Sequence, residues 1–464
     1  MGPGVPCRGG GSRLRVALVP TRRMRRAIRH PPRRRGIPIH PMTIVLGHRI
    51  TDWRPEGIGE AELLRHLYVL GKTGSGKSTA LLRILAGWLE GGNGAALVDP
   101  HGDLAADFLL RIPRSRSSDV VVIDPSDRSR PVAWNPLWRV PPERRPVVAQ
   151  GLVGAFRGVW RDSWGPRMEY ILVNGLRLLL DAEEESLLGL QRLLVDPAYR
   201  RHLERRCLDP VVARFWRLEF DSWDARFRRE AVSPIQNKIG QFLGDPLIRG
   251  ILGQRRSRLD LRNSMDRGRI LVVSLSKGLV GEGTANLLGA LLVASLHEAA
   301  LSRADLPEEG RRPFLLAVDE FQSVATDRFA SALSEARKYG LGLVLSHQFL
   351  DQLLPEVRSA ALGNAGSMLL FRMGGGDATQ FSLELGREWP ASRLADLPSY
   401  HAVLCSTAEG GPPVARVILT AAPGPPSRKP GEVEGMLERS RQRFGSDGGD
   451  VERSLERWME RKFR

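Results

Sequence analysis

A glycine-rich segment between an apolar strand and a helix constrains this chain more than any other feature. Residues 71–79 (GKTGSGKST) fit the pattern G-x-x-x-x-G-K-[ST] and directly follow the apolar residues 67–70. Glycines let a backbone wrap a chain of phosphates without clashes from Cβ atoms, and the N-terminus of the following helix offers N–H groups to an anion. Two of the seven lysines in the chain lie in this loop. The segment therefore predicts a nucleotide phosphate site within an α/β fold.

The residue types of the loop assign its roles. We expect the Lys77 ammonium to contact the β- and γ-phosphates of ATP, and the Ser78 hydroxyl to ligate Mg²⁺. A glycine-rich turn without a ligand is the alternative, and the strand–helix context disfavours it. The residues expected to bind the nucleotide are Gly71, Thr73, Gly74, Ser75, Gly76, Lys77, Ser78 and Thr79.

A second segment supplies acidic side chains. Residues 314–318 are apolar, as in a buried central strand, and Asp319 and Glu320 follow them. Ligands gather at the carboxyl ends of strands in open α/β sheets. Asp319 suits the Mg²⁺ shell through water, and Glu320 is placed to polarise the attacking water. Many strands end in acids, so this pair is informative only together with the phosphate loop, and its glutamate favours hydrolysis over binding alone.

Two polar positions flank the strand expected over residues 341–346. Gln348 follows this strand and is expected to touch the γ-phosphate or its water, with a helix-capping turn as the alternative. Arg337 precedes the strand at the end of a helix, where a basic residue also suits the helix dipole. The functional interpretation is that Arg337 reaches a neighbouring subunit's nucleotide as an arginine finger. The catalytic residues expected are thus Glu320, Lys77, Gln348 and Arg337, and the metal ligands are Ser78 and Asp319.

The alternation of strand and helix patterns divides the chain into five stretches, of which the first is residues 1–41. Apolar strands alternate with helices over residues 42–135 and again over 266–421, which is typical of a parallel sheet. Helical periodicity dominates residues 136–265, as over 168–180 and 208–220, and six of the ten tryptophans fall between Trp134 and Trp223. We expect these tryptophans in cores and interfaces rather than as base-stacking platforms. Residues 422–464 are rich in Pro and Gly and then in charge, and they predict a tail or an assembly arm with one late helix.

The net charge of +17 is concentrated at the amino terminus. Residues 1–41 hold eleven arginines and no acidic residue, which leaves 58 basic and 52 acidic residues, a balance of only +6, over the remaining chain. Such a segment is expected to be disordered. It is either a basic arm that grips phosphates or a stretch that precedes a true start at Met42. It also resembles an organelle transit peptide, although its prolines oppose an amphipathic helix.

Cysteine usage and hydropathy limit the location of the chain. Three widely spaced cysteines exclude a disulfide scaffold and a cysteine-rich zinc module, and they suggest a reducing compartment. No apolar run reaches the roughly 18–20 residues that span a bilayer, and the N-terminus lacks the apolar core of a signal peptide. The longest run, residues 287–296, predicts a buried helix. We expect a cytoplasmic protein without its own membrane span, either free or peripheral at the inner face of the membrane.

The ordered motifs resemble those of the FtsK/HerA superfamily of DNA-pumping ATPases, and most of all the coupling proteins of conjugative type IV secretion (TraD/TraG type). The resemblance covers about residues 60–421. The blocks around the phosphate loop and the Asp-Glu pair are generic to nucleotide hydrolases, whereas residues 99–103 (DPHGD) and the block over 335–348 are much more particular. The resemblance rests on residues 71–79, 99–103, 274–278, 317–322, 335–348 and 364–372.

The resemblance implies a RecA-like P-loop NTPase with a mainly parallel sheet and an inserted all-α domain. It implies a homo-hexameric ring that hydrolyses ATP with Mg²⁺ at subunit interfaces and moves single- or double-stranded DNA through its centre. A secretion-channel or relaxase-type protein is the implied partner. The resemblance also makes Arg372 a second basic candidate near the interface, with a salt bridge inside the sheet as the alternative. Lys277 and the loop after Gly278 are candidates for the pore.

One departure from the family pattern leaves the function open. Conjugative coupling proteins usually begin with membrane-spanning helices, and none is expected here, which puts docking to a secretion channel in doubt. A DNA-translocating motor predicts ATP hydrolysis that DNA stimulates with a steep salt dependence. An ATPase that powers protein export or remodels a secretion complex predicts stimulation by a protein partner instead. A nucleotide-switched scaffold is the third possibility, and Glu320 argues against it because a switch does not need that base.

Overall fold

The computed structural model describes residues 43–326, 329–386, 388–407 and 413–463. The expectations for the arginine-rich residues 1–41 fall outside this range.

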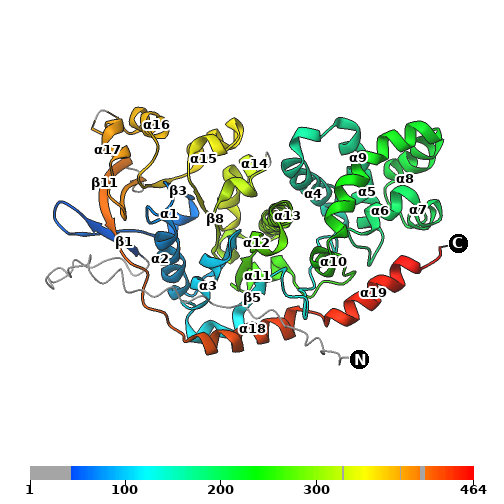
Figure 1. The fold of residues 1–464 in the computed structure, drawn as a ribbon, viewed down its shortest axis with the longest axis horizontal. Helices are drawn as coiled ribbons and strands as arrows, with labels where there is room; N and C mark the ends of the chain where they lie inside the picture. Colours follow the sequence, from blue (N-terminus) through cyan, green and yellow to red (C-terminus); the bar gives the residue numbers. More distant parts are fainter. Residues whose placement is uncertain (1–42, 327–328, 387, 408–412, 464) are drawn as a thin grey trace, which may run out of the picture. The chain divides into compact units, whose positions relative to one another are not determined.

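Eleven strands of the described chain form one sheet in the order β2-β1-β11-β10-β9-β3-β8-β7-β4-β6-β5 (Figure 1). The neighbours from β9 to β5 are parallel, while β10, β11, β1 and β2 continue the sheet in antiparallel pairs. The strands are β1 (Ile44–Arg49), β2 (Pro55–Ile58), β3 (Leu67–Leu70), β4 (Gly94–Asp99), β5 (Val120–Ile123), β6 (Ile270–Ser274), β7 (Phe314–Val318), β8 (Leu341–His347), β9 (Ser367–Leu370), β10 (His401–Thr407) and β11 (Pro413–Thr420).

The central strands are buried on both faces, which explains their continuous apolar sequences. On β7, Leu315 and Ala317 contribute to the hydrophobic cluster of one face, whereas Leu316 and Val318 contribute to the cluster of the other. The first face is covered by α2 (Lys77–Glu90), α3 (Asp103–Leu109) and α18 (Pro430–Phe444), and the second by α13 (Glu282–Leu301). The remaining helices of the α/β part are α1 (Glu60–Leu64), α12 (Lys277–Val280), α14 (Phe329–Glu335), α15 (Pro355–Asn364), α16 (Gly375–Leu385) and α17 (Ala391–Ala395).

All elements described between β5 and β6 are helices, and their apolar residues share one hydrophobic cluster with the α13 face of the sheet. Within this segment Trp134 and Trp216 are buried, as expected of core tryptophans. A helix expected over residues 208–220 is divided, because α8 passes into a π-helical turn (Phe215–Glu219). The main helices are α4 (Arg145–Val159), α5 (Pro166–Asp181), α6 (Gly189–Val195), α7 (Pro197–Glu204), α8 (Pro210–Arg214), α9 (Ala225–Gly244), α10 (Pro246–Leu252) and α11 (Leu261–Asp266).

The apolar run at residues 287–296 forms the middle of α13, and most of its side chains are buried. The helical stretch Glu282–Asp305 is long and apolar enough to cross a membrane, although the strictly apolar run within it is shorter. Within its most apolar window, 61% is buried inside the protein. Burial of this kind is typical of a core helix, and a single such helix is weak support for a membrane span.

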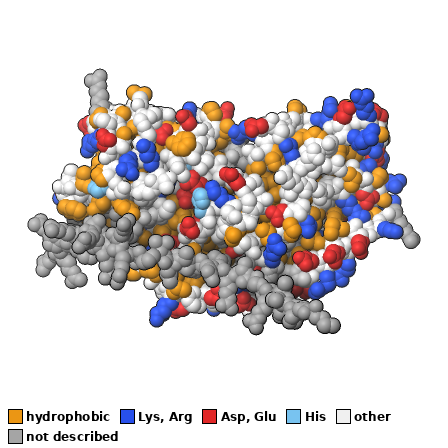
Figure 2. Space-filling view, viewed as in Figure 1, with side chains coloured by type: hydrophobic (Ala, Val, Ile, Leu, Met, Phe, Trp, Pro, Cys, Tyr) orange, Lys and Arg blue, Asp and Glu red, His pale blue; other side chains and the backbone are white. Residues whose placement is uncertain are grey.

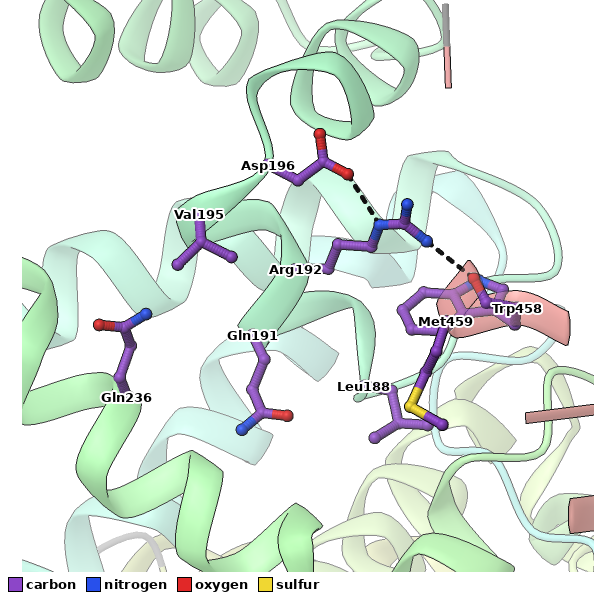
Figure 3. A pocket seen from close by; sticks show the side chains of 8 residues that line it. All are labelled: Leu188, Gln191, Arg192, Val195, Asp196, Gln236, Trp458 and Met459. Carbon is purple, nitrogen blue, oxygen red and sulfur yellow. Dashed lines mark hydrogen bonds and ion pairs between the residues drawn. The ribbon is translucent and has the colours of Figure 1, made fainter. Parts of the chain in front are cut away.

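The carboxyl-terminal stretch forms two helices, whereas its sequence predicts one. Pro430 lies in the first turn of α18, where proline is favourable because its missing N–H has no helical partner. Val433 and Met436 then pack into the sheet cluster, so this part of the chain is core rather than tail. The later helix α19 (Gly448–Glu460) is the expected one. The Trp458 carbonyl of α19 accepts a 2.7 Å hydrogen bond from Arg192 of α6, beside a hollow that both of these helices line (Figure 3).

Candidate active site

The phosphate loop leaves the buried strand β3 and enters α2, whose first residue is Lys77. Gly74 and Gly76 have φ values of 74° and 120°, a region that residues with a Cβ rarely adopt. A Cβ on Gly76 would also lie 3.1 Å from atoms of the Phe371 and Tyr400 rings. The glycines predicted from the motif are thus required by backbone conformation and by close packing.

Three flanking segments fasten the loop through its backbone. The Gly71 N–H donates to the His347 carbonyl (3.3 Å), and the Lys72 N–H donates to the Arg372 carbonyl (2.8 Å). On the far side, the Tyr400 N–H donates to the Ser75 carbonyl (2.7 Å). The loop is therefore held between the carboxyl ends of β8 and β9 and the start of β10.

Lys77 is 7% exposed and lies across the loop. Its Nζ donates to the Gly71 carbonyl (2.6 Å) and to the Lys72 carbonyl (3.3 Å). Burial lowers the pKa of Lys77, while the nearby carboxylates of Glu320 and Asp319 act in the opposite direction. An ammonium held in this position is pointed at the space that the loop encloses, where phosphate oxygens could replace its carbonyl partners.

Asp319 follows β7 and is 8% exposed, with its N–H bonded to the Val98 carbonyl (3.0 Å). Burial raises the pKa of this carboxyl to about 6. Ser78, the other predicted metal ligand, is exposed in the first turn of α2. Among the described residues no cluster of three or more His, Cys, Asp or Glu side chains could hold a metal. A hydroxyl and one carboxylate still fit Mg²⁺, which usually takes one or two protein ligands together with water and phosphate oxygens.

Glu320 has a φ of 45°, a left-handed conformation that few residues other than glycine adopt. Its two carboxylate oxygens are each bonded to an amide. Gln348 Nε2 donates to Oε1 (2.9 Å), and Gln322 Nε2 donates to Oε2 (2.6 Å). Burial alone would raise the pKa of Glu320, but these two amides and Lys77 outweigh it and the pKa lies below its usual value. The side chain is therefore ionised at neutral pH and fixed in orientation.

Gln348 joins the acidic segment to the phosphate loop. Its Oε1 accepts a hydrogen bond from Thr73 Oγ1 (3.2 Å), while its Nε2 holds Glu320. The structure thus brings together Thr73, Lys77, Glu320 and Gln348, which were predicted from separate parts of the chain. Gln322 was not predicted as a site residue, and its proximity to Asp319 and Glu320 in the sequence was the available signal.

Residues 99–103 have a structural role at the same edge of the sheet. Asp99 is fully buried, and its carboxylate accepts the N–H groups of His101 and Ala105 (both 2.9 Å) at the start of α3. Gly102 has a φ of 96°, and a Cβ there would lie 2.8 Å from Ser276 Oγ. Residues 99–103 and 274–278, two blocks of the family resemblance, are therefore in close contact, and the absence of a side chain at Gly102 makes room for Ser276.

The basic candidates Arg337 and Arg372 lie at opposite ends of the parallel strands, Arg337 before β8 and Arg372 after β9. Arg372 is half-buried at the phosphate-loop edge, and no ion pair joins it to another described residue, so the structure gives no support to a salt bridge inside the sheet. Arg337 is exposed in the 3₁₀ turn η10 (Ala336–Tyr339), just before β8, whereas Gln348 follows β8. Seven extended residues span roughly 20 Å, so Arg337 is remote from its own subunit's loop.

Replacing Asp319 with Asn is expected to stabilise the nucleotide-free protein. Because burial raises the pKa to about 6, keeping the charged carboxylate buried costs free energy above pH 6, and that cost fades as the pH falls towards the ordinary value of 3.8. Asp319→Asn removes a cost on the order of 2 kcal/mol at pH 7.5 and much less at pH 4.5. Urea unfolding of both proteins in EDTA at the two pH values measures the difference.

Asp99→Asn is the matched control, since it changes another buried aspartate on the adjacent strand. Its carboxylate accepts two backbone N–H groups, so the substitution is expected to destabilise by about 1–3 kcal/mol. Equal losses of stability in the two variants would contradict the assignment of Asp319 as a carboxylate whose burial outweighs its hydrogen bonds in the absence of nucleotide.

Comparison with known proteins places this geometry among related folds. Residues 58–205 match the family described as the central domain of helicase HerA. A comparison with curated proteins finds no match. The structure is similar to the unbound bacterial conjugative coupling protein TrwBdeltaN70, with a TM-score of 0.58 and 19% identity over 81% of this chain and 89% of that chain.

Two further structures agree in fold. The plasmid coupling protein TrwB in complex with a non-hydrolysable ATP analogue has a TM-score of 0.59 and 20% identity over 80% of this chain and 88% of that chain. VirB4 of Thermoanaerobacter pseudethanolicus has a TM-score of 0.55 and 18% identity over 84% of this chain and 99% of that chain. The predicted RecA-like fold, with its mainly parallel sheet and inserted helices, is therefore confirmed. The family match over residues 58–205, which include the phosphate loop, confirms the predicted resemblance to the FtsK/HerA superfamily over that part of the chain.

Proposed function

We propose that the chain is a Mg²⁺-dependent ATPase that moves DNA through a ring of identical subunits. The single observation that supports hydrolysis is the hydrogen-bonded series from Thr73 through Gln348 to Glu320, set opposite Lys77. It places an ionised carboxylate beside the loop that would hold the γ-phosphate. A binding site without turnover would not need such a group.

In this proposal each residue has one part. The loop N–H groups and Lys77 hold the β- and γ-phosphates, and Ser78 and Asp319 hold Mg²⁺, which offsets negative charge on the phosphates. Glu320 accepts a proton from the attacking water, whose oxygen bonds to the γ-phosphorus as the bond to the β–γ bridging oxygen breaks. Gln348 orients that water through its contact with Glu320.

The DNA part of the proposal is supported by the family match and by the charge of the helical segment. The face in Figure 2 shows basic and acidic side chains interspersed, with many basic ones at the outer end of this segment. Only part of this charge is offset by acidic neighbours, as with Arg226 and Glu230 (3.1 Å). Phosphate contacts from such arginines give binding that weakens steeply with salt. Exposed arginines lie on α7 and just after it, on α8 and the π-helical turn that follows it, and on α9: Arg201, Arg205, Arg206, Arg214, Arg217, Arg226 and Arg229.

The ring is supported by the position of Arg337. Its distance from the loop of its own subunit excludes action there, so in this proposal Arg337 acts on the nucleotide of a neighbour. Lys277 and the exposed Leu279 of α12, which follows β6, remain the candidates for a surface that contacts DNA in the pore.

Steady-state ATP hydrolysis by the purified chain tests the proposal. It should be measured without DNA, with single strands and with duplex, each at low and moderate salt. Lys77→Ala should abolish turnover, and Lys72→Ala is the matched control because Lys72 is an exposed lysine of the same loop.

Stimulation by DNA that fades with salt is the expected result. ATP hydrolysis that DNA does not stimulate would contradict the proposed DNA translocation but not the proposed ATPase activity. It would favour the alternative of protein export or secretion-complex remodelling. Absence of turnover under all conditions, with intact nucleotide binding, would contradict the catalytic assignment and favour a nucleotide-switched scaffold.

A further inference from the structure

Tyr400 lies beside the phosphate loop, immediately before β10. Its N–H donates to the Ser75 carbonyl (2.7 Å), and its own carbonyl accepts from the Thr420 N–H (2.8 Å) and Oγ1 (2.9 Å). It has a φ of 66°, which is rare for a bulky residue. The backbone thus holds an aromatic residue in an unusual conformation against the loop.

The ring of Tyr400 is one of two that pack on Gly76. Tyr400 Cδ1 and Phe371 Cε1 each lie 3.1 Å from the position that a Cβ of Gly76 would occupy. Phe371 is fully buried, whereas Tyr400 is 37% exposed. Of these two rings, only Tyr400 offers surface to a ligand at the N-terminus of α2.

The order of strands in the sheet indicates which way a bound triphosphate would run along the loop. Glu320 and Gln348 follow β7 and β8, on one side of β3, and they mark the γ-phosphate end through the contact of Gln348 with Thr73. The strands β9 and β10 lie on the other side of β3. A phosphate chain that passes along the loop therefore carries its nucleoside towards β9 and β10, where Tyr400 precedes β10.

We propose that the Tyr400 ring stacks on the base of the bound nucleotide. This inference rests on the proposed ATPase function and adds the site of the base to it. Aromatic stacking contributes affinity without hydrogen-bond readout, since every base has a π-face. Tyr400 therefore increases the affinity for ATP and GTP alike and does not discriminate between them.

Calorimetric titration with two ligands separates this role from a structural one. The ligands are a non-hydrolysable ATP analogue and inorganic tripolyphosphate, each with Mg²⁺, and the protein is the whole chain. Tyr400→Ala is expected to weaken the analogue about tenfold or more, with tripolyphosphate affinity changed less than twofold. Tyr400→Phe keeps the ring and should bind both ligands as the wild type does.

Two further variants keep the test decisive. Tyr170→Ala removes an exposed tyrosine of α5 and should change neither affinity. Tyr400→Leu keeps apolar bulk without a π-face and replaces Tyr400→Ala if that variant fails to fold.

Equal weakening of both ligands would overturn the proposal, because Tyr400 would then only support the loop. Unchanged affinity for the analogue would overturn it as well. A wild-type protein that binds tripolyphosphate but not the analogue would overturn the base site alone. A wild-type protein that binds neither ligand would overturn the proposed function and this inference with it.

Discussion

Glu320→Gln is expected to lower kcat for ATP hydrolysis by about 10²–10⁴-fold while nucleotide affinity stays within a few-fold of wild type. The amide cannot accept the proton of the attacking water. The depressed pKa of Glu320 also predicts that the wild-type enzyme keeps its base ionised well below neutral pH. Single-turnover hydrolysis, together with titration of a non-hydrolysable analogue, separates the chemical step from binding.

Local structure is the main complication for this variant. Both oxygens of Glu320 accept amide donors from Gln348 and Gln322, so a glutamine at this position must turn its own NH₂ group towards one of them. We expect a loss of about 1 kcal/mol in unfolding free energy, which thermal unfolding would show. Glu309→Gln is the matched control, since Glu309 is exposed near the start of β7 and should keep full activity. Full turnover by Glu320→Gln would remove Glu320 from the catalytic role.

The convergence of Lys77, Glu320 and Gln348 could be anticipated because each follows a strand of one parallel sheet. The carboxyl ends of such strands meet at one edge, so distance along the chain does not matter. The contacts themselves could not be anticipated. The hydrogen bond from Gln322 to Glu320 depends on the left-handed conformation of Glu320, which turns the chain so that the two side chains face each other. Nothing in the sequence specifies that turn.

The same limit applies to the particular motif at residues 99–103. The resemblance marks this segment, but it does not say whether the residues bind a ligand or shape the edge. In the structure Asp99 uses both carboxylate oxygens on backbone N–H groups of its own turn, a local role that competes with ligand binding. Tyr400 was outside every motif, and only its position against Gly76 makes it a candidate.

The parallel strands were predicted well because each is a short apolar run with a helix after it. The two helices at the carboxyl terminus show where composition misleads. Pro430 and Gly431 open α18, and both residue types had favoured an irregular tail. The apolar positions Val433, Met436 and Leu437 have helical spacing, but their partners lie on the sheet, far away in sequence. Tertiary packing therefore decided this element.

Arg337→Ala is expected to reduce kcat by about 10³–10⁵-fold if the residue acts as an arginine finger between subunits. The side chain is exposed, so its removal should leave thermal unfolding unchanged. The turn that carries it is fixed by other residues, since the buried Arg303 donates to the Tyr339 carbonyl (3.0 Å). Lys338→Ala is the matched control, because Lys338 is the next residue, basic and exposed, and should retain activity.

Mixing inactive subunits distinguishes action between subunits from action within one. In a mixture of Arg337→Ala and Lys77→Ala proteins, some interfaces pair an intact phosphate loop with an intact Arg337 from the neighbour. Those interfaces should hydrolyse ATP, so activity should rise above that of either variant alone and depend on the mixing ratio. Each variant subunit lacks one of the two groups, so only an interface between the two variants can supply both. Arg337 and the loop of the same chain lie at opposite ends of β8, which is why the two groups are expected to come from different subunits. Activity that stays at the level of the separate variants, while both proteins still assemble, would contradict the finger and leave Arg337 as a charge at the end of a helix.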